Sequence, residues 1–215
     1  VCTSYCCVDH ETGKKRLEML KTDIMDREIQ FEQVANDLFL AMHNVTYKTS
    51  ILKENSIRLD NGFYTDLEYL LFPTPYIHTV AFLSQTIYMY RISLSTQSMN
   101  IKSLQKNVQM HRDVLEHLLR EYEAYHMSAH WNASIGSYYC KRIAATVGTQ
   151  LSIYLSFKDT KTYKKITKAM VEELKREHDT VYREIMKLKT FQVLVHTGFS
   201  SYGIVSSMHR KKLGF

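Results

Sequence analysis

Residues that break regular secondary structure are scarce in this chain, and this scarcity restricts its fold more than any other feature. Only two prolines and seven glycines occur among 215 residues, whereas sandwiches and barrels need a turn about every 8–12 residues. Hydrophobic residues make up 45% and charged residues 23% of the chain, so it can bury a core without a structural metal. The sequence therefore predicts an all-α protein.

Apolar residues recur at alternating steps of three and four, the spacing of amphipathic helices. We expect a long helix that begins at Leu17 and ends between Asn55 and the Asn61-Gly62 turn, and a short one from Thr65 to the bend at Pro73. Further helices are expected over 76–94, 101–125, 134–157 and 160–188, with a loop at 95–98 and a last short helix after 190. The breaks are short, which predicts a disulfide-linked bundle of about six to seven mostly antiparallel helices. Residues 1–215 would form a single helical domain, with subdomains 1–95 and 96–215 as the alternative.

The four cysteines are spread unevenly, with Cys2, Cys6 and Cys7 near the N-terminus and Cys140 in the middle of the chain. A bond between the adjacent Cys6 and Cys7 would be strained. We therefore expect Cys2 to pair with one of these two and Cys140 to pair with the other. Such pairing requires an oxidising compartment, so we predict a secreted protein. The alternative is four thiols in a reducing cytosol.

Two glycosylation sequons, beginning at Asn44 and Asn132, are compatible with secretion. No segment approaches the roughly 18 uninterrupted apolar residues of a membrane span. The most apolar segment, residues 76–94, is interrupted by Arg91 and other polar residues. We therefore expect no membrane anchor and interpret this segment as a buried helix in the middle of the bundle.

The polar residues show no arrangement that is typical of catalysis. Glu123, His126 and His130 share one helix face, but a di-iron site needs a second Glu-x-x-His motif and a zinc protease needs Glu directly after the first histidine. Nucleophile-elbow, phosphate-loop and dinucleotide-binding motifs do not occur. We predict a protein that is not an enzyme and that uses no metal and no cofactor.

The chain has a formal net charge of +6 and gathers its basic residues in two places. The predicted basic patch consists of Lys158, Lys161, Lys164, Lys165, Lys168, Arg210, Lys211 and Lys212. Acidic residues follow in the same helix, from Glu172 to Glu184, so a mixed solvated face is the favoured interpretation and nucleic acid is not the expected partner. Binding to nucleic acid or to another anionic surface is kept as an alternative.

A Ser-Tyr-x-Cys pattern occurs twice, as Ser-Tyr-Cys-Cys at residues 4–7 and as Ser-Tyr-Tyr-Cys at residues 137–140. A small secreted protein with separated cysteine–tyrosine motifs resembles the bicycle family of aphid effectors, which is named for paired Cys-Tyr-Cys motifs. Neither motif here reads Cys-Tyr-Cys. The resemblance implies a non-enzymatic helical protein that acts on host targets through its surface, with Tyr5, Tyr138 and Tyr139 as the motif tyrosines.

The predicted function is a secreted, non-enzymatic helical effector or interaction protein that acts on host or extracellular protein targets. Its fifteen tyrosines are compatible with this prediction, because tyrosine provides contact area at a low entropy cost. The favoured interpretation of the tyrosines is nevertheless that they fill the layers of the bundle, with their hydroxyls at its rim. A secreted cytokine-like signalling ligand is the alternative, although the short breaks do not provide the two long connections of that bundle.

Overall fold

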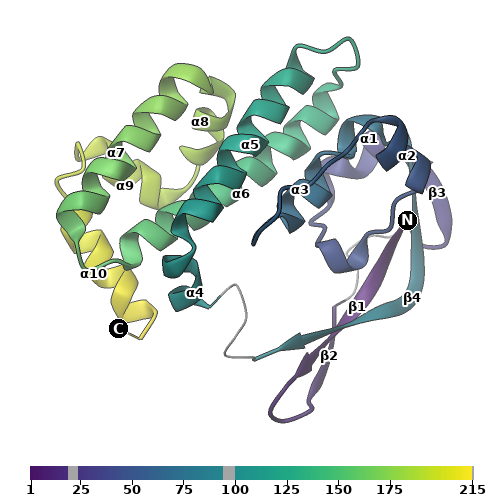
Figure 1. Cartoon of the computed structure of the whole chain (residues 1–215), viewed down its shortest axis with the longest axis horizontal. Helices are drawn as coiled ribbons and strands as arrows, with labels where there is room; N and C mark the ends of the chain where they lie inside the picture. The colour runs from purple at the N-terminus through teal and green to yellow at the C-terminus, as the bar shows by residue number, and fades with distance from the viewer. Residues whose placement is uncertain (19–23, 94–99, 215) are drawn as a thin grey trace. The chain divides into compact units, whose positions relative to one another are not determined.

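The computed structural model describes residues 1–18, 24–93 and 100–214. The chain divides into two compact units (Figure 1). Unit 1 consists of Val1–Asn100 and Glu121–Tyr139, and unit 2 consists of Ile101–Arg120 and Cys140–Phe215. The long helices α5 (Val108–His126) and α6 (Ala133–Ser156) therefore each contribute residues to both units.

Unit 1 contains a four-stranded sheet with the strand order β2-β1-β4-β3. The two central strands, β1 (Cys2–Asp9) and β4 (Thr79–Ile92), run parallel to each other. The edge strands β2 (Lys15–Glu18) and β3 (Arg27–Gln30) have four residues each and are antiparallel to their neighbours. The prediction of an all-α bundle is therefore wrong: the fold combines helices with a mixed sheet.

Short helices complete unit 1. They are α1 (Phe31–Val34), α2 (Thr49–Glu54), α3 (Asp66–Leu71) and the 3-10 turns η1 (Ala35–Asp37), η2 (Met42–Asn44) and η3 (Thr74–Tyr76). Phe31, Leu71, Phe82 and Tyr138 are buried in this unit. The ring of Trp131 packs so closely on α6 that a Cβ atom at residue 136 would lie 2.0 Å from it, so only glycine fits there.

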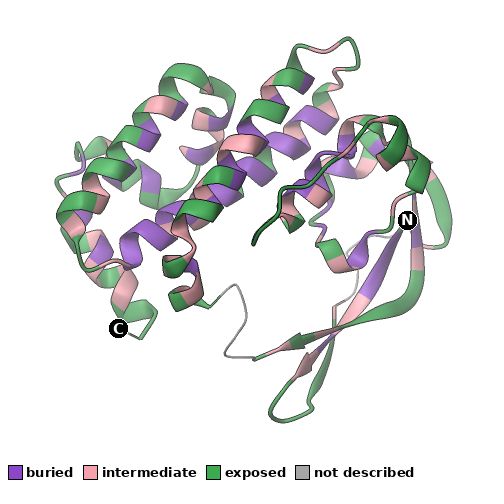
Figure 2. Cartoon of the chain, viewed as in Figure 1, coloured by how far each residue is buried: buried purple, intermediate pink, exposed green. Residues whose placement is uncertain are grey.

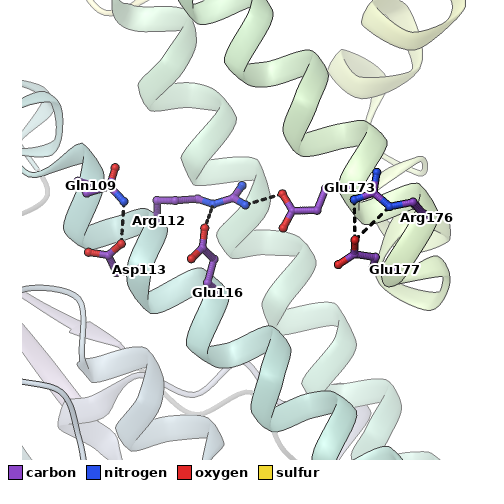
Figure 3. Close-up of polar contacts among 7 residues, drawn as sticks. All are labelled: Gln109, Arg112, Asp113, Glu116, Glu173, Arg176 and Glu177. Carbon is purple, nitrogen blue, oxygen red and sulfur yellow. Dashed lines mark hydrogen bonds and ion pairs between the residues drawn. The ribbon is translucent and has the colours of Figure 1, made fainter.

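Unit 2 is helical in the part of it that the structure describes. It contains α4 (Ile101–Lys106), parts of α5 and α6, α7 (Thr160–Glu177), α8 (Asp179–Ile185), α9 (Lys189–His196) and α10 (Tyr202–Lys212). Buried residues follow one side of α7 and exposed residues the other (Figure 2). Arg112 joins α5 to α7, because it donates hydrogen bonds to Glu116 over 2.6 Å and to Glu173 over 2.7 Å (Figure 3).

The long helix predicted to begin at Leu17 and the helix predicted over 76–94 are the main errors of the sequence analysis. Residues 79–92 form β4 instead, because they are rich in β-branched and aromatic side chains, which favour strands. The segment 17–45 contributes to β2 and contains β3, α1, η1 and η2, while its residues 19–23 lie outside the described ranges.

The scarcity of glycine did not exclude a sheet, because other residues adopt the left-handed backbone conformation. Asp26 has a φ of 56° just before β3, and Ser93 has a φ of 68° just after β4. Aspartate tolerates this conformation better than most side chains do. The chain therefore turns before β3 and after β4 without glycine, whereas the turn between β1 and β2 uses Gly13 at a φ of 68°.

The helices predicted between residues 101 and 188 are confirmed in their positions, with breaks at Asn107 and His178. The single last helix predicted after residue 190 is instead two helices, α9 and α10. Asp159 caps α7, since its carboxylate accepts a hydrogen bond from the Thr162 amide over 3.1 Å. The helix predicted from Thr65 is α3, but Thr65 makes no side-chain cap hydrogen bond. The loop predicted at 95–98 lies outside the described residues.

No disulfide joins the four cysteines, all of which the structure describes, so the predicted disulfide-linked fold is also wrong. Cys6 and Cys7 are consecutive on β1 and therefore lie on opposite faces of the sheet. Cys2, Cys7 and Cys140 are buried and pack as small apolar side chains. Burial raises the pKa of the Cys2 thiol to about 11, so this thiol stays protonated.

Candidate interaction surface

Strand pairing sorts the side chains of β1, β2 and β4 onto two faces. On one face, Cys6 pairs with Leu17 of β2 and with Met89 of β4, so these three side chains form a row across the sheet. The next row on this face contains Lys15, Val8 and Arg91. We call these two rows, Leu17-Cys6-Met89 and Lys15-Val8-Arg91, the open face.

The opposite face carries tyrosines and is covered by η2. The ring of His43 stacks on Tyr90 at a centroid distance of 4.6 Å and on Tyr88 at 5.5 Å, and Tyr5 meets it edge-on at 4.1 Å. Burial lowers the pKa of His43, while the charge of Asp66 opposes this shift. The imidazole therefore acts as an aromatic cover for the tyrosine face.

None of the described residues forms such a cover over the open face. Leu17 is 51% exposed and Met89 is 58% exposed, and Ile87, at an irregularity in the β1–β4 pairing, is 71% exposed. Single exposed apolar residues are ordinary, whereas a contiguous apolar patch indicates a binding surface. Lys15 and Arg91 are exposed and form a basic border beside the apolar row.

Among the described residues, β3 pairs with the edge of β4 only as far as Phe82. β3 pairs only with Thr79–Phe82, and its ladder ends at Asp26, whose amide donates to the Phe82 carbonyl over 2.7 Å. The Asp26 carboxylate then accepts a hydrogen bond from the Ser84 amide over 3.3 Å. From Tyr88 to Ile92, β4 pairs with β1 alone among the described strands, and Figure 2 shows much of this length exposed.

The two outer edges of this part of the sheet differ in chemistry. β2 is short and carries the charged side chains Lys15, Arg16 and Glu18, which is how proteins prevent an edge strand from pairing with other chains. β4 instead presents Ile87, Tyr88 and Met89 next to its edge, all of them exposed. This arrangement can bind an extended segment through backbone hydrogen bonds and apolar contacts.

The residues of the predicted basic patch all lie in unit 2. Lys158 precedes α7, four lysines lie on α7, and the other three residues lie at the end of α10. Arg210 donates to the Phe157 carbonyl over 2.9 Å, which brings both groups to the same end of α6. Lys168 forms an ion pair with Glu172 over 3.6 Å, as expected for a mixed face.

The motif tyrosines do not form a common surface. Tyr5 lies on a strand, whereas Tyr138 and Tyr139 are only 2% and 1% exposed on α6. The ring of Tyr138 packs against Phe31 and that of Tyr139 against Tyr122, with centroid distances of 6.0 and 5.7 Å. Burial raises the pKa of Tyr139 well above its ordinary value. The repeated sequence pattern therefore corresponds to two different local structures.

Both sequon asparagines take part in the fold. Asn44 is buried, and its side-chain oxygen accepts a hydrogen bond from the Ala41 amide over 3.0 Å. Asn132 caps α6 by accepting hydrogen bonds from the Ser134 amide over 2.9 Å and the Ile135 amide over 3.1 Å, and its nitrogen donates to Glu32. A glycan on either side chain would compete with these contacts.

The histidines of the predicted helix face do not form a metal site. Among the described residues, Glu123, His126 and His130 do not bring their ligand atoms together. The ring of His126 instead packs edge-on against Trp131 at a centroid distance of 4.5 Å. This contact assigns His126 to an aromatic cluster.

Sequence reasoning missed the open face because its apolar row combines residues from three strands. The available signal was the run of β-branched and aromatic residues at 86–92, which favours a strand.

None of the helices in the described ranges is both long enough and apolar enough to cross a membrane. Comparisons with protein-family models, with curated proteins and with solved structures find no match for this chain.

Proposed function

We propose that this chain is a non-enzymatic interaction protein that binds an extended apolar segment of a protein partner on the open face and along β4. The observation that carries the proposal is the exposed apolar row of Leu17, Cys6 and Met89, extended by Ile87. The predicted secretion loses its main support because the four cysteines are thiols. The proposal therefore concerns the interaction and names no compartment.

Two kinds of contact would hold the partner. A strand added to the edge of β4 forms backbone hydrogen bonds, and its alternate side chains reach the apolar row. Burying a large apolar side chain completely stabilises by about 1.5–3 kcal/mol, and Ile87, Leu17 and Met89 are each about half exposed or more. Lys15 and Arg91 favour an acidic residue at one end of the partner segment, since complementary charge fixes orientation.

Peptide selection with the whole chain tests this function. Peptides selected from a random display library should be apolar, extended and acidic at one end. The variants Ile87→Lys and Met89→Lys should each weaken their binding about tenfold or more, because a charge would have to be buried. Ile204→Lys is the matched control, because Ile204 is 69% exposed on α10 in the other unit.

The mode of binding is tested with the same peptides. In an added strand, every second backbone N–H donates to the edge of β4. N-methylation of this set of nitrogens should therefore abolish binding, whereas N-methylation of the other set should not. Peptides that bind Met89→Lys as tightly as the parent chain would contradict the proposal. Binding to anionic vesicles alone, lost on adding salt, would instead support the alternative of an anionic-surface binder.

A further inference from the structure

Unit 2 contains a second site that is independent of the open face. A cavity of about 650 Å³ is lined by residues of α6, by the segment that begins α9, and by α10. Leu151, Leu155 and Phe191 are buried and form its apolar floor. Val205 and Met208 contribute the wall on α10. The volume lies within the range of about 300–1,000 Å³ that is usual for small-molecule sites.

The polar residues at this cavity are basic or neutral. Lys189, at the start of α9, and Lys212, at the end of α10, both line it and are exposed. None of the described residues that line the cavity is acidic. The cavity therefore combines an apolar interior with two positive charges at its rim.

His209 completes the polar side of the cavity. Its Nε2 atom lies 2.9 Å from the Ser152 hydroxyl, and both residues line the cavity. Burial lowers the pKa of His209; the hydrogen bond with Ser152 opposes this shift, and the charge of Lys212 adds to it. At neutral pH the positive charge at the cavity is therefore carried by the two lysines, and His209 with Ser152 adds neutral hydrogen-bonding groups.

We propose that this cavity binds a single-chain amphiphile with an anionic head, namely a long-chain carboxylate. The acyl chain would pack against Leu151, Leu155 and Phe191, and the carboxylate would lie between the ammonium groups of Lys189 and Lys212. The charge of the rim selects the sign of the head group, and the apolar floor selects the chain. Neither element is needed for the open face, so the two proposals fail or succeed separately.

Calorimetric titration of the whole chain tests this proposal with defined probes. Laurate, kept below its micellar concentration, should bind with one molecule per chain, and acetate should show no binding. Each methylene added to the carboxylate should strengthen binding about three- to fourfold until the cavity is filled. Dodecyltrimethylammonium, which has the same chain length and the opposite charge, should bind about tenfold more weakly or worse.

Charge reversal at the rim separates head-group recognition from unspecific attraction. Lys189→Glu and Lys212→Glu should each weaken laurate binding about tenfold. Lys161→Glu makes the same change in net charge in the first turn of α7, away from the cavity lining, and should leave the affinity unchanged. Equal losses in all three variants would show that only the net charge matters and would overturn the assigned site.

Filling the cavity provides the second test. Gly148 lines the cavity, and a Cβ atom added there would meet Leu188 at 3.5 Å, an ordinary contact, so a side chain can begin at this position and would extend into the cavity. Gly148→Leu should retain helical content and thermal stability while losing laurate binding, since glycine is a poor helix former. Unchanged laurate binding in Gly148→Leu, or equal affinity for laurate, dodecanol and dodecyltrimethylammonium, would overturn the proposal.

Discussion

At the scale of single residues, the packing of His43 makes the stability of the sheet depend on pH. The ring lies against three tyrosines, and burial lowers its pKa below the ordinary value of 6.5 while Asp66 opposes the shift. The unfolded chain therefore takes up a proton on this histidine more readily than the folded chain does. The stability that His43 contributes is present above pH 6.5 and is lost as the pH falls through 6.5 towards the lowered value.

The prediction is a decrease in melting temperature between about pH 7.5 and pH 5.5, the range in which histidines titrate. His43→Gln should reduce this decrease, whereas His10→Gln, at an exposed residue of the β1–β2 turn, should leave it unchanged. Part of the decrease should remain, because the pKa of His209 is lowered as well. The Asp9 carboxyl does not contribute to the decrease in this pH range, since hydrogen bonds from Ser93 and Thr12 hold its pKa at about 2. An unchanged decrease in His43→Gln would contradict this account.

At the scale of secondary-structure elements, the sequence predicted the elements that depend on interactions between residues close in sequence and missed those that depend on residues distant in sequence. The helices after residue 100 depend on local signals, such as the three-four spacing and the Asp159 cap, and these can be recognised within about 15 residues. The sheet depends on pairings such as that of Cys2 with Phe82, which are distant in sequence. The open face could not be predicted for the same reason, because Leu17, Cys6 and Met89 become neighbours only through strand register.

The prediction at this scale concerns the start of α6, which is capped by the side chain of Asn132. Asn132→Ala removes the acceptor for the Ser134 and Ile135 amides, so it should lower the free energy of unfolding by about 1 kcal/mol, within a range of roughly 0.5–2. Asn132→Ser should restore most of this loss, because serine also caps helices well. Urea denaturation measures both values, and equal stabilities of the alanine and serine variants would exclude a capping role.

At the scale of the whole molecule, the fold contains no covalent cross-link among its cysteines. Sequence reasoning treated the three N-terminal cysteines as half-cystines because they are crowded within six residues. Their place on β1 removes that argument, since the strand directs Cys6 and Cys7 to opposite faces and buries Cys2 and Cys7. The stability of the chain therefore comes from packing and hydrogen bonding.

This fold should be insensitive to reducing agents, and thiol labelling measures that property directly. The melting temperature should be the same with and without reductant. An alkylating reagent should label the half-buried Cys6 first and label Cys2, Cys7 and Cys140 only after denaturation, because access limits thiol reactivity. Four labels on the denatured chain without prior reduction would agree with the structure. A mass deficit of four hydrogens, with Cys140 linked to an N-terminal peptide, would instead restore the two pairings expected from sequence and place this protein in an oxidising compartment.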